Sequence, residues 1–95
     1  MGKQETLEFE WDEEKEKLNI KKHGISFSTA ALVFDDEDRI EIYDAVHSLE
    51  EDRYITIGSV GKILFVVYTS RDPSIRLISA RLANERERRL YYGNN

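Results

Sequence analysis

Arginine is the residue type in this chain that is best suited to chemistry. Five arginines fall within residues 75–92, in a chain whose formal net charge is −5. Guanidinium groups bind phosphate through paired hydrogen bonds and stabilise the charge that develops at a reacting phosphate. The candidates are Arg53, Arg71, Arg76 and Arg81. A structural ion-pair network with Glu50, Glu51 and Asp52 is the alternative use of these cations.

Two histidines could transfer protons, because imidazole titrates near neutral pH. His23 follows Lys22 at the end of a predicted helix, and His47 lies in a predicted loop. A helix-end cap or a loop hydrogen bond is the structural alternative for each of them. Tyr91 could supply a hydroxyl or a stacking ring, but its spacing beside Leu90 favours packing in the core.

No metal or cofactor is expected. The histidines lack the spacing of a zinc site, the chain has no cysteine, and the acidic run at residues 35–38 lacks the glycine and distal glutamate of a calcium loop. Phosphate-binding glycine loops and the serine-hydrolase motif are also absent from the sequence.

Charge is unevenly distributed along the 95 residues, with a formal −10 over residues 1–52 and +5 over residues 53–95. A local basic patch sets the field that a polyanion meets, so the acidic total argues only weakly against a nucleic-acid ligand. The composition predicts a single domain over residues 1–95, with residues 1–6 as a loose N-terminal extension. We expect no membrane span and no secretory signal, in keeping with a cytoplasmic protein.

Local patterns predict the elements that carry these residues. In chain order they are a strand at residues 6–12, helices at 12–23 and 27–34, a loop at 35–38, strands at 39–46, 53–60, 62–70 and 75–83, and a helix at 84–92. Asp12 can cap the first helix and Gly24 can end it. Gly61 indicates a tight hairpin, and Asn84 with Glu87 matches a capping box. The predicted fold is α+β, in the order β-α-α-β-β-β-β-α, with helices on a mostly antiparallel sheet.

This sheet predicts how the arginines lie relative to one another. Arg53 begins one hairpin strand and Arg71 ends the other, so both should lie at one end of the sheet. Arg76, at the start of the last strand, should lie near that same end, and Arg81 should lie toward the opposite end. Arg76 and Arg81 should also project from opposite faces, unless a bulge intervenes. A phosphate site nevertheless requires several of these groups to converge on one accessible concave spot.

Four stretches of the chain form an ordered set: FEWDEEKEKLNIKKHGISF, HSLEEDRYITIG, FVVYTSR and IRLISAR. Together they resemble the BrnT-type toxins of BrnT/BrnA type II toxin–antitoxin modules, from about Phe9 to Tyr91. The resemblance implies a RelE-like ribonuclease fold and RNA cleavage that arrests bacterial growth. The residues that match the motifs are Lys22, His23, Gly24, His47, Ser48, Glu51, Arg53, Arg71, Arg76, Ser79 and Arg81.

The resemblance also implies a mechanism and partners. RNA would be cleaved without a metal, with the ribose 2′-hydroxyl as nucleophile. A BrnA-type antitoxin would neutralise the toxin, with two copies of each in a heterotetramer, and operator DNA would be contacted only through the antitoxin. The expected catalytic residues are Arg53, Arg71, Arg81 and His23, and the expected substrate-binding residues are Lys22, Arg76, His47 and Tyr91.

Two non-catalytic functions stay open on the sequence. The basic half could dock an acidic partner and cleave nothing, or the chain could act as a co-repressor bound to the antitoxin. No helix-turn-helix, zinc-finger or ribonucleoprotein signature supports a nucleic-acid-binding regulator on its own.

Overall fold

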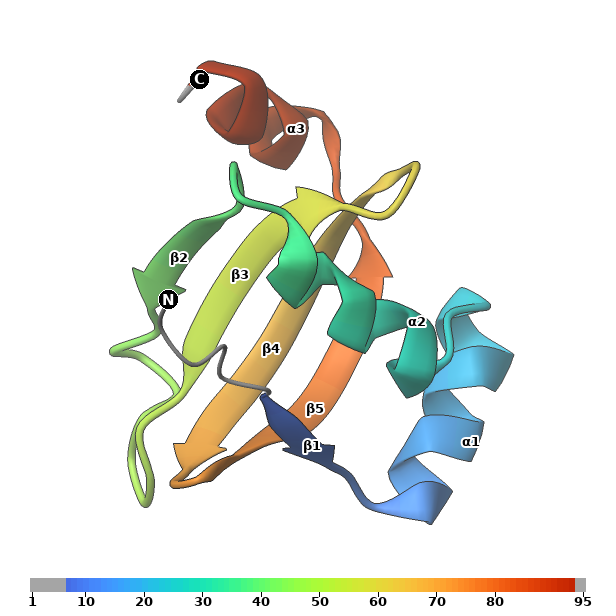
Figure 1. Cartoon of the computed structure of the whole chain (residues 1–95), viewed down its shortest axis with the longest axis vertical. Coiled ribbons are helices and arrows are strands. Elements are labelled where there is room, and N and C mark those ends of the chain that lie inside the picture. Colours follow the sequence, from blue (N-terminus) through green and yellow to red (C-terminus); the bar gives the residue numbers. More distant parts are fainter. Residues whose placement is uncertain (1–6, 94–95) are drawn as a thin grey trace, which may run out of the picture.

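The computed structural model describes residues 7–93 and contains a five-stranded sheet with helices on both sides (Figure 1). The elements are β1 (Glu8–Glu10), α1 (Glu13–His23), α2 (Phe27–Ala31), the 3-10 turn η1 (Leu32–Asp35), β2 (Ile40–Tyr43), β3 (Tyr54–Ser59), β4 (Ile63–Arg71), β5 (Ser74–Leu82) and α3 (Glu85–Gly93). This order confirms the predicted α+β fold. The loose extension predicted for residues 1–6 lies outside the described residues.

The strands are arranged β1-β5-β4-β3-β2, with β4 in the centre as predicted. The short β1 runs parallel to β5, and the other neighbouring pairs are antiparallel. Gly61 turns the chain between β3 and β4 with a φ of 96°, a left-handed conformation that favours glycine. The predicted hairpin is therefore confirmed.

Two predicted elements are shorter than their sequence patterns. The strand predicted at residues 39–46 ends at Tyr43, because Asp44 begins a turn in which its carboxylate accepts a hydrogen bond from the His47 amide. The helix predicted at 27–34 becomes the tighter η1 turn after Ala31. The predicted caps hold, since Asp12 accepts from the Lys15 amide at 3.0 Å, and Gly24 ends α1 with a φ of 74°.

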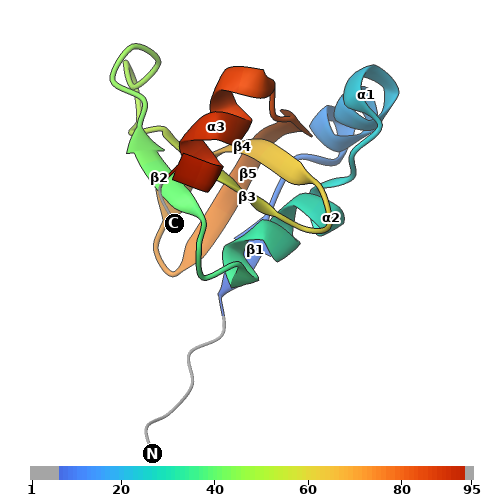
Figure 2. The same cartoon turned by 90° about the horizontal axis from the view of Figure 1, so that it is seen from above.

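Side chains from the two sides of the sheet form two apolar clusters. One lies beneath α2 and includes Phe27, Val33 and Val66, all fully buried. The other lies between α3 and the sheet and includes Ile57 of β3 and Tyr91 of α3. Figure 2 shows α2 and α3 on opposite sides of the sheet. Within residues 7–93, no helix combines the length and apolar character needed to cross a membrane.

Candidate active site

A β-bulge in β5 decides which way two of the predicted arginines point. Arg81 pairs with Phe65 across the β4–β5 ladder, whereas Arg76 pairs with Thr69. Phe65 and Thr69 lie four residues apart in β4 and share a face, so Arg76 and Arg81 share it too. The register shift within this ladder absorbs the odd residue. The bulge that the sequence left open is therefore present, and both arginines lie on the α3 side of the sheet.

The same register separates the arginines along that face. Arg53 precedes β3 and Arg71 ends β4, so both lie at the end of the sheet where Arg76 enters β5, as predicted. The backbone of Arg81 lies about 13 Å from that of Arg76, the length of four strand residues. Arg76 pairs with Glu10 of β1 and Arg81 with Glu87 of α3, so Arg81 does not converge with the other guanidinium groups on one spot as predicted. They form an extended row, which we call the arginine row: Arg53, Arg71, Arg76 and Arg81.

At the end of the row that lies away from Arg81, two arginines are paired with carboxylates. Arg71 Nη2 lies 3.3 Å from Glu51 Oε1, and Arg76 Nη1 lies 3.2 Å from Glu10 Oε2. The ion-pair alternative is thus realised for Arg71. Arg53, by contrast, has no ion pair with any described residue.

Arg53 instead lines a hollow of about 310 Å³ that is formed by residues of the loop joining β2 to β3, including Glu50 and Glu51. His47 lines the same hollow, and its Nδ1 lies 2.9 Å from Asp44 Oδ2. The loop therefore brings two of the predicted site residues together, at the opposite end of the row from Arg81.

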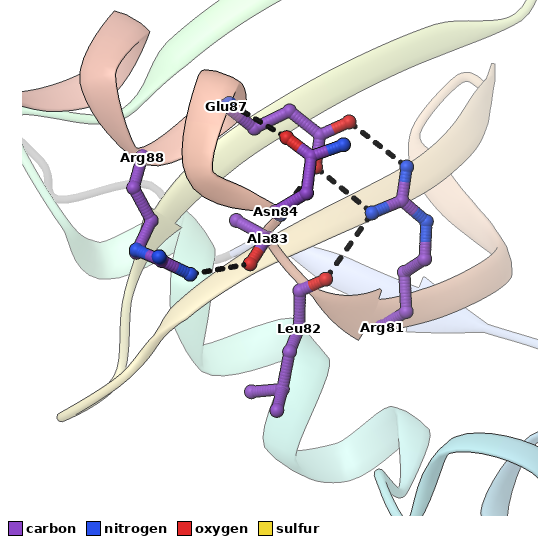
Figure 3. A network of polar contacts seen from close by, with 6 residues as sticks. All are labelled: Arg81, Leu82, Ala83, Asn84, Glu87 and Arg88. Atoms are coloured by element: carbon purple, nitrogen blue, oxygen red, sulfur yellow. Dashed lines mark hydrogen bonds and ion pairs between the residues drawn. The ribbon is translucent and has the colours of Figure 1, made fainter.

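Arg81 is held by Glu87 and the Leu82 carbonyl (Figure 3), and also by the ring of Phe65. Its Nη1 and Nη2 donate to the two carboxylate oxygens of Glu87 at 2.8 and 2.9 Å, and Nη1 also donates to the Leu82 carbonyl at 3.1 Å. Its guanidinium carbon lies 3.9 Å from the centre of the Phe65 ring. An arginine has five N–H donors, so Nε–H and one N–H of Nη2 have no partner among the described residues. The Arg81 side chain is 36% exposed.

Glu87 both fixes Arg81 and starts α3. Its Oε1 accepts from the Asn84 amide at 2.9 Å, and its own amide donates to Asn84 Oδ1 at 2.8 Å, which confirms the predicted capping box. The hydrogen bonds from Arg81 hold the pKa of Glu87 below its usual value. Glu87 is therefore ionised at neutral pH. The sequence identified its capping role and missed its pairing with Arg81, because the two residues belong to different elements.

α1 brings Lys22 and His23 beside the middle of the arginine row. Both side chains line a hollow together with Ser79 of β5. Ser79 lies on the face of the arginine row, between Arg76 and Arg81. His23 and Lys22 therefore approach β5 from the edge of the sheet, whereas Arg81 is held from the side of α3.

Asn19 attaches α1 to β5 and was not singled out in the sequence. Its buried amide donates to the Ala80 and Ile25 carbonyls, both at 2.9 Å, and accepts from the Ala80 amide at 3.1 Å. These bonds replace those of a neighbouring strand, since β1 pairs only with Ser74–Arg76. The available signal was an asparagine within a helix, where this residue type is unfavourable without a specific partner.

Tyr91 projects from α3 into the core between this helix and the sheet. It is only 6% exposed, packs with Ile57 and Ile63, and donates its hydroxyl to Asp36 Oδ2 at 2.6 Å. The hydrogen bond to Asp36, together with burial, raises the pKa of Tyr91 to about 12. This is the core packing that its spacing favoured, and it leaves the ring unavailable for the predicted contact with substrate.

Comparisons with known proteins bear on the family and the fold. The family model described as the ribonuclease toxin BrnT of type II toxin–antitoxin systems matches residues 11–87. The crystal structure of the Brucella abortus ribonuclease toxin BrnT is similar, with a TM-score of 0.61 and 25% sequence identity over 84% of this chain and 100% of that chain. No curated protein matches the chain. Because the family model covers most of its length, the chain belongs to the BrnT family of ribonuclease toxins.

Proposed function

We propose that this chain cleaves RNA along the arginine row, without a metal ion and with the ribose 2′-hydroxyl as nucleophile. Membership of a ribonuclease toxin family supplies the class of reaction. The observation that carries the proposal is the guanidinium of Arg81, which is fixed by Glu87 and Phe65 and keeps two donors for an anion. A phosphate can bind Nε–H and Nη2–H there while the pair with Glu87 stays intact.

The reaction needs a cation at the phosphate and groups that move two protons. The 2′ oxygen forms a bond to the adjacent phosphorus and the bond from phosphorus to the 5′ oxygen breaks, which leaves a 2′,3′-cyclic phosphate and a 5′-hydroxyl. The 2′-hydroxyl gives its proton to a base, and the 5′ oxygen takes one from an acid. We assign the stabilisation of phosphate charge to Arg81 and one of the two proton transfers to His23, with Lys22 helping to position the strand. Solvent water exchanges the other proton.

The rest of the arginine row binds the substrate farther along. Arg76 is paired with Glu10 and Arg81 with Glu87, so the two guanidinium groups face different partners rather than one common phosphate. We therefore assign Arg53, Arg71 and Arg76 to phosphates that flank the reacting one, with His47 beside them. Arg71 and Arg76 exchange their carboxylate partners for phosphate when RNA binds.

The family also implies an antitoxin partner. We propose that this partner is of the BrnA type, that two copies of each chain form a heterotetramer in the cytoplasm, and that operator DNA binds to the antitoxin. The RelE-like designation of the fold belongs to the same proposal. Carboxylates of the antitoxin would pair with the arginine row in place of phosphates. Charge reversal of Arg53 and Arg71 should then weaken the complex, as measured by calorimetry.

Chelation and substrate chemistry test the mechanism. Purified protein should cleave RNA in excess chelator, and the products should end in a 2′,3′-cyclic phosphate. An oligonucleotide with one 2′-deoxyribose at the cleaved position should stay intact. Cleavage that stops on chelation and returns with added Mg²⁺ contradicts the metal-free mechanism. If folded protein cleaves no RNA, either alone or with translating ribosomes, the non-catalytic docking function is favoured.

A further inference from the structure

A second cationic hollow lies beyond the end of β5. Its lining includes Lys62 at the β3–β4 hairpin, Leu82 of β5, and Arg88 and Tyr92 of α3. Figure 3 shows Arg88 and Arg81 on opposite sides of the segment that joins β5 to α3. Leu82 directly follows Arg81 in the chain, so one residue of the lining is the immediate sequence neighbour of the last residue of the arginine row.

Both cations of this hollow lack a carboxylate partner. Neither Lys62 nor Arg88 forms an ion pair with any residue between 7 and 93, and none of the described residues that line the hollow is acidic. Arg88 Nη1 donates to the Ala83 carbonyl at 2.9 Å, which holds the guanidinium at the wall of the hollow. Arg89, on the same helix, is instead paired with Glu85 at 3.0 Å. The charge in this hollow is therefore available to an anion from outside.

An exposed ring lies beside these cations. Tyr92 is 62% exposed, and its ring packs edge-to-face against buried Tyr91, with the ring centres 5.3 Å apart. Leu82 adds a second exposed apolar side chain. Cations that track a phosphate backbone, next to an aromatic ring on which a base can stack, are the features of a groove for single-stranded nucleic acid.

We propose that this hollow is a subsite for a nucleotide of RNA that flanks the cleaved bond. Lys62 and Arg88 bind its phosphate, and the base stacks on Tyr92. The assignment rests on the proposed function, because Arg81 is the neighbouring phosphate site. A strand that leaves Arg81 reaches the hollow by passing the start of α3, and the Arg81–Glu87 pair need not open.

Binding of a 2′-O-methyl RNA oligonucleotide tests this subsite without cleavage, because the probe has no free 2′-hydroxyl. Fluorescence anisotropy gives its Kd over a range of salt concentrations. The Tyr92→Ala variant should raise Kd at least about fivefold, the lower value for one stacked base, and Tyr92→Phe should not. The Lys62→Glu variant should lower the slope of log K against log salt by about 0.7, the value of one phosphate contact on a single strand.

The Arg86→Glu variant is the matched control, since it reverses an exposed charge on α3 outside the hollow. Equal effects of Arg86→Glu and Lys62→Glu overturn the subsite, as does unchanged affinity in Tyr92→Ala. Cleavage separates this inference from the proposed function. Wild-type protein that cleaves RNA with normal affinity in the hollow variants refutes the subsite alone. Wild-type protein that binds the probe through the hollow and cleaves no RNA supports the subsite and refutes the proposed function.

Discussion

Two arginines of this molecule have closely similar contacts and very different neighbours. Each guanidinium lies over a phenylalanine ring, 4.7 Å from its centre for Arg39 and 3.9 Å for Arg81. Each also pairs with a glutamate, Arg39 with Glu41 at 3.0 Å and Arg81 with Glu87 at 2.8 Å. The ring and the carboxylate orient the cation in both cases, so these contacts alone do not distinguish a structural arginine from a catalytic one.

The surroundings of the two arginines differ. Arg39 lines a hollow together with Asp35, Asp36, Glu37 and Glu41, and it donates to the hydroxyl of buried Thr56. Arg81 shares its face of the sheet with Ser79 and Arg76. A phosphate that approaches Arg39 meets a cluster of carboxylates. One that approaches Arg81 meets Glu87, the hydroxyl of Ser79, and Arg76 with its own partner Glu10. The field around an oriented guanidinium therefore decides whether an anion can use it.

Removing each arginine is the strongest test of this difference. Arg81→Ala should lower the rate of RNA cleavage by about 10²–10³-fold, the usual cost of losing one preorganised donor group at a reacting centre. Arg81→Lys should restore little, because an ammonium lacks the planar pair of donors. Arg39→Ala should leave cleavage within a few-fold of wild type. Equal losses of activity in the two folded alanine variants would erase the distinction.

The Tyr91–Asp36 hydrogen bond joins α3 to the hollow that Arg39 and Asp36 line. Breaking this bond should have the next largest effect. Tyr91→Phe keeps the ring and removes the hydroxyl that donates to the carboxylate at 2.6 Å. The free energy of unfolding should fall by about 1.5 kcal/mol, because hydrogen bonds to charged groups are stronger than neutral ones. Urea denaturation measures the change, and an unchanged midpoint would mean that this link does not stabilise α3.

The ion pair of Arg39 should contribute less. Arg39→Ala should cost about 1 kcal/mol of stability, because Glu41 is 48% exposed and its attraction to Arg39 is screened by solvent. Denaturation at low and high salt should show a smaller difference between variant and wild type at high salt. A loss of stability that salt does not change would assign the effect to packing of Arg39 on the Phe34 ring.

The smallest expected effect is on the pH dependence of stability. Arg81 lowers the pKa of Glu87 in the folded chain, so the charged carboxylate stabilises the fold above its unfolded pKa. That stability is lost as pH falls through the lower, folded pKa. Glu87→Gln keeps an acceptor for the capping box and does not titrate. Between pH 7 and pH 3, the free energy of unfolding should therefore fall less for this variant than for wild type. The difference between the two decreases should be about 0.5 kcal/mol.

Short-range signals predicted most of the fold, because they act within a few residues. The Asp12 cap, the left-handed glycines at 24 and 61, and the reciprocal bonds of Asn84 and Glu87 each depend on local geometry, and each is found. The parallel pairing of β1 with β5 and the bulge in β5 depend on contacts across the sheet. No local pattern carries that information.

The candidate site also has features that the sequence predicted and features that depend on contacts between distant residues. Residue types pointed to the arginines, and strand order placed Arg53, Arg71 and Arg76 together, at a distance from Arg81. The carboxylate that each arginine would meet could not be predicted, since Arg76 and Glu10 lie 66 residues apart in the chain. The bulge in β5, which turned Arg76 and Arg81 to one face, also required the full register.

The contacts of Asn19 have a consequence for how other proteins can approach this molecule. An uncovered strand edge is a template on which another extended chain can pair. β1 covers the outer edge of β5 at Ser74–Arg76, and the Asn19 amide bonds both backbone groups of Ala80. A protein that approaches the face of the arginine row from this edge would therefore have to recognise side-chain charge and shape at these positions, because the backbone groups of Ser74–Arg76 and Ala80 are already bonded.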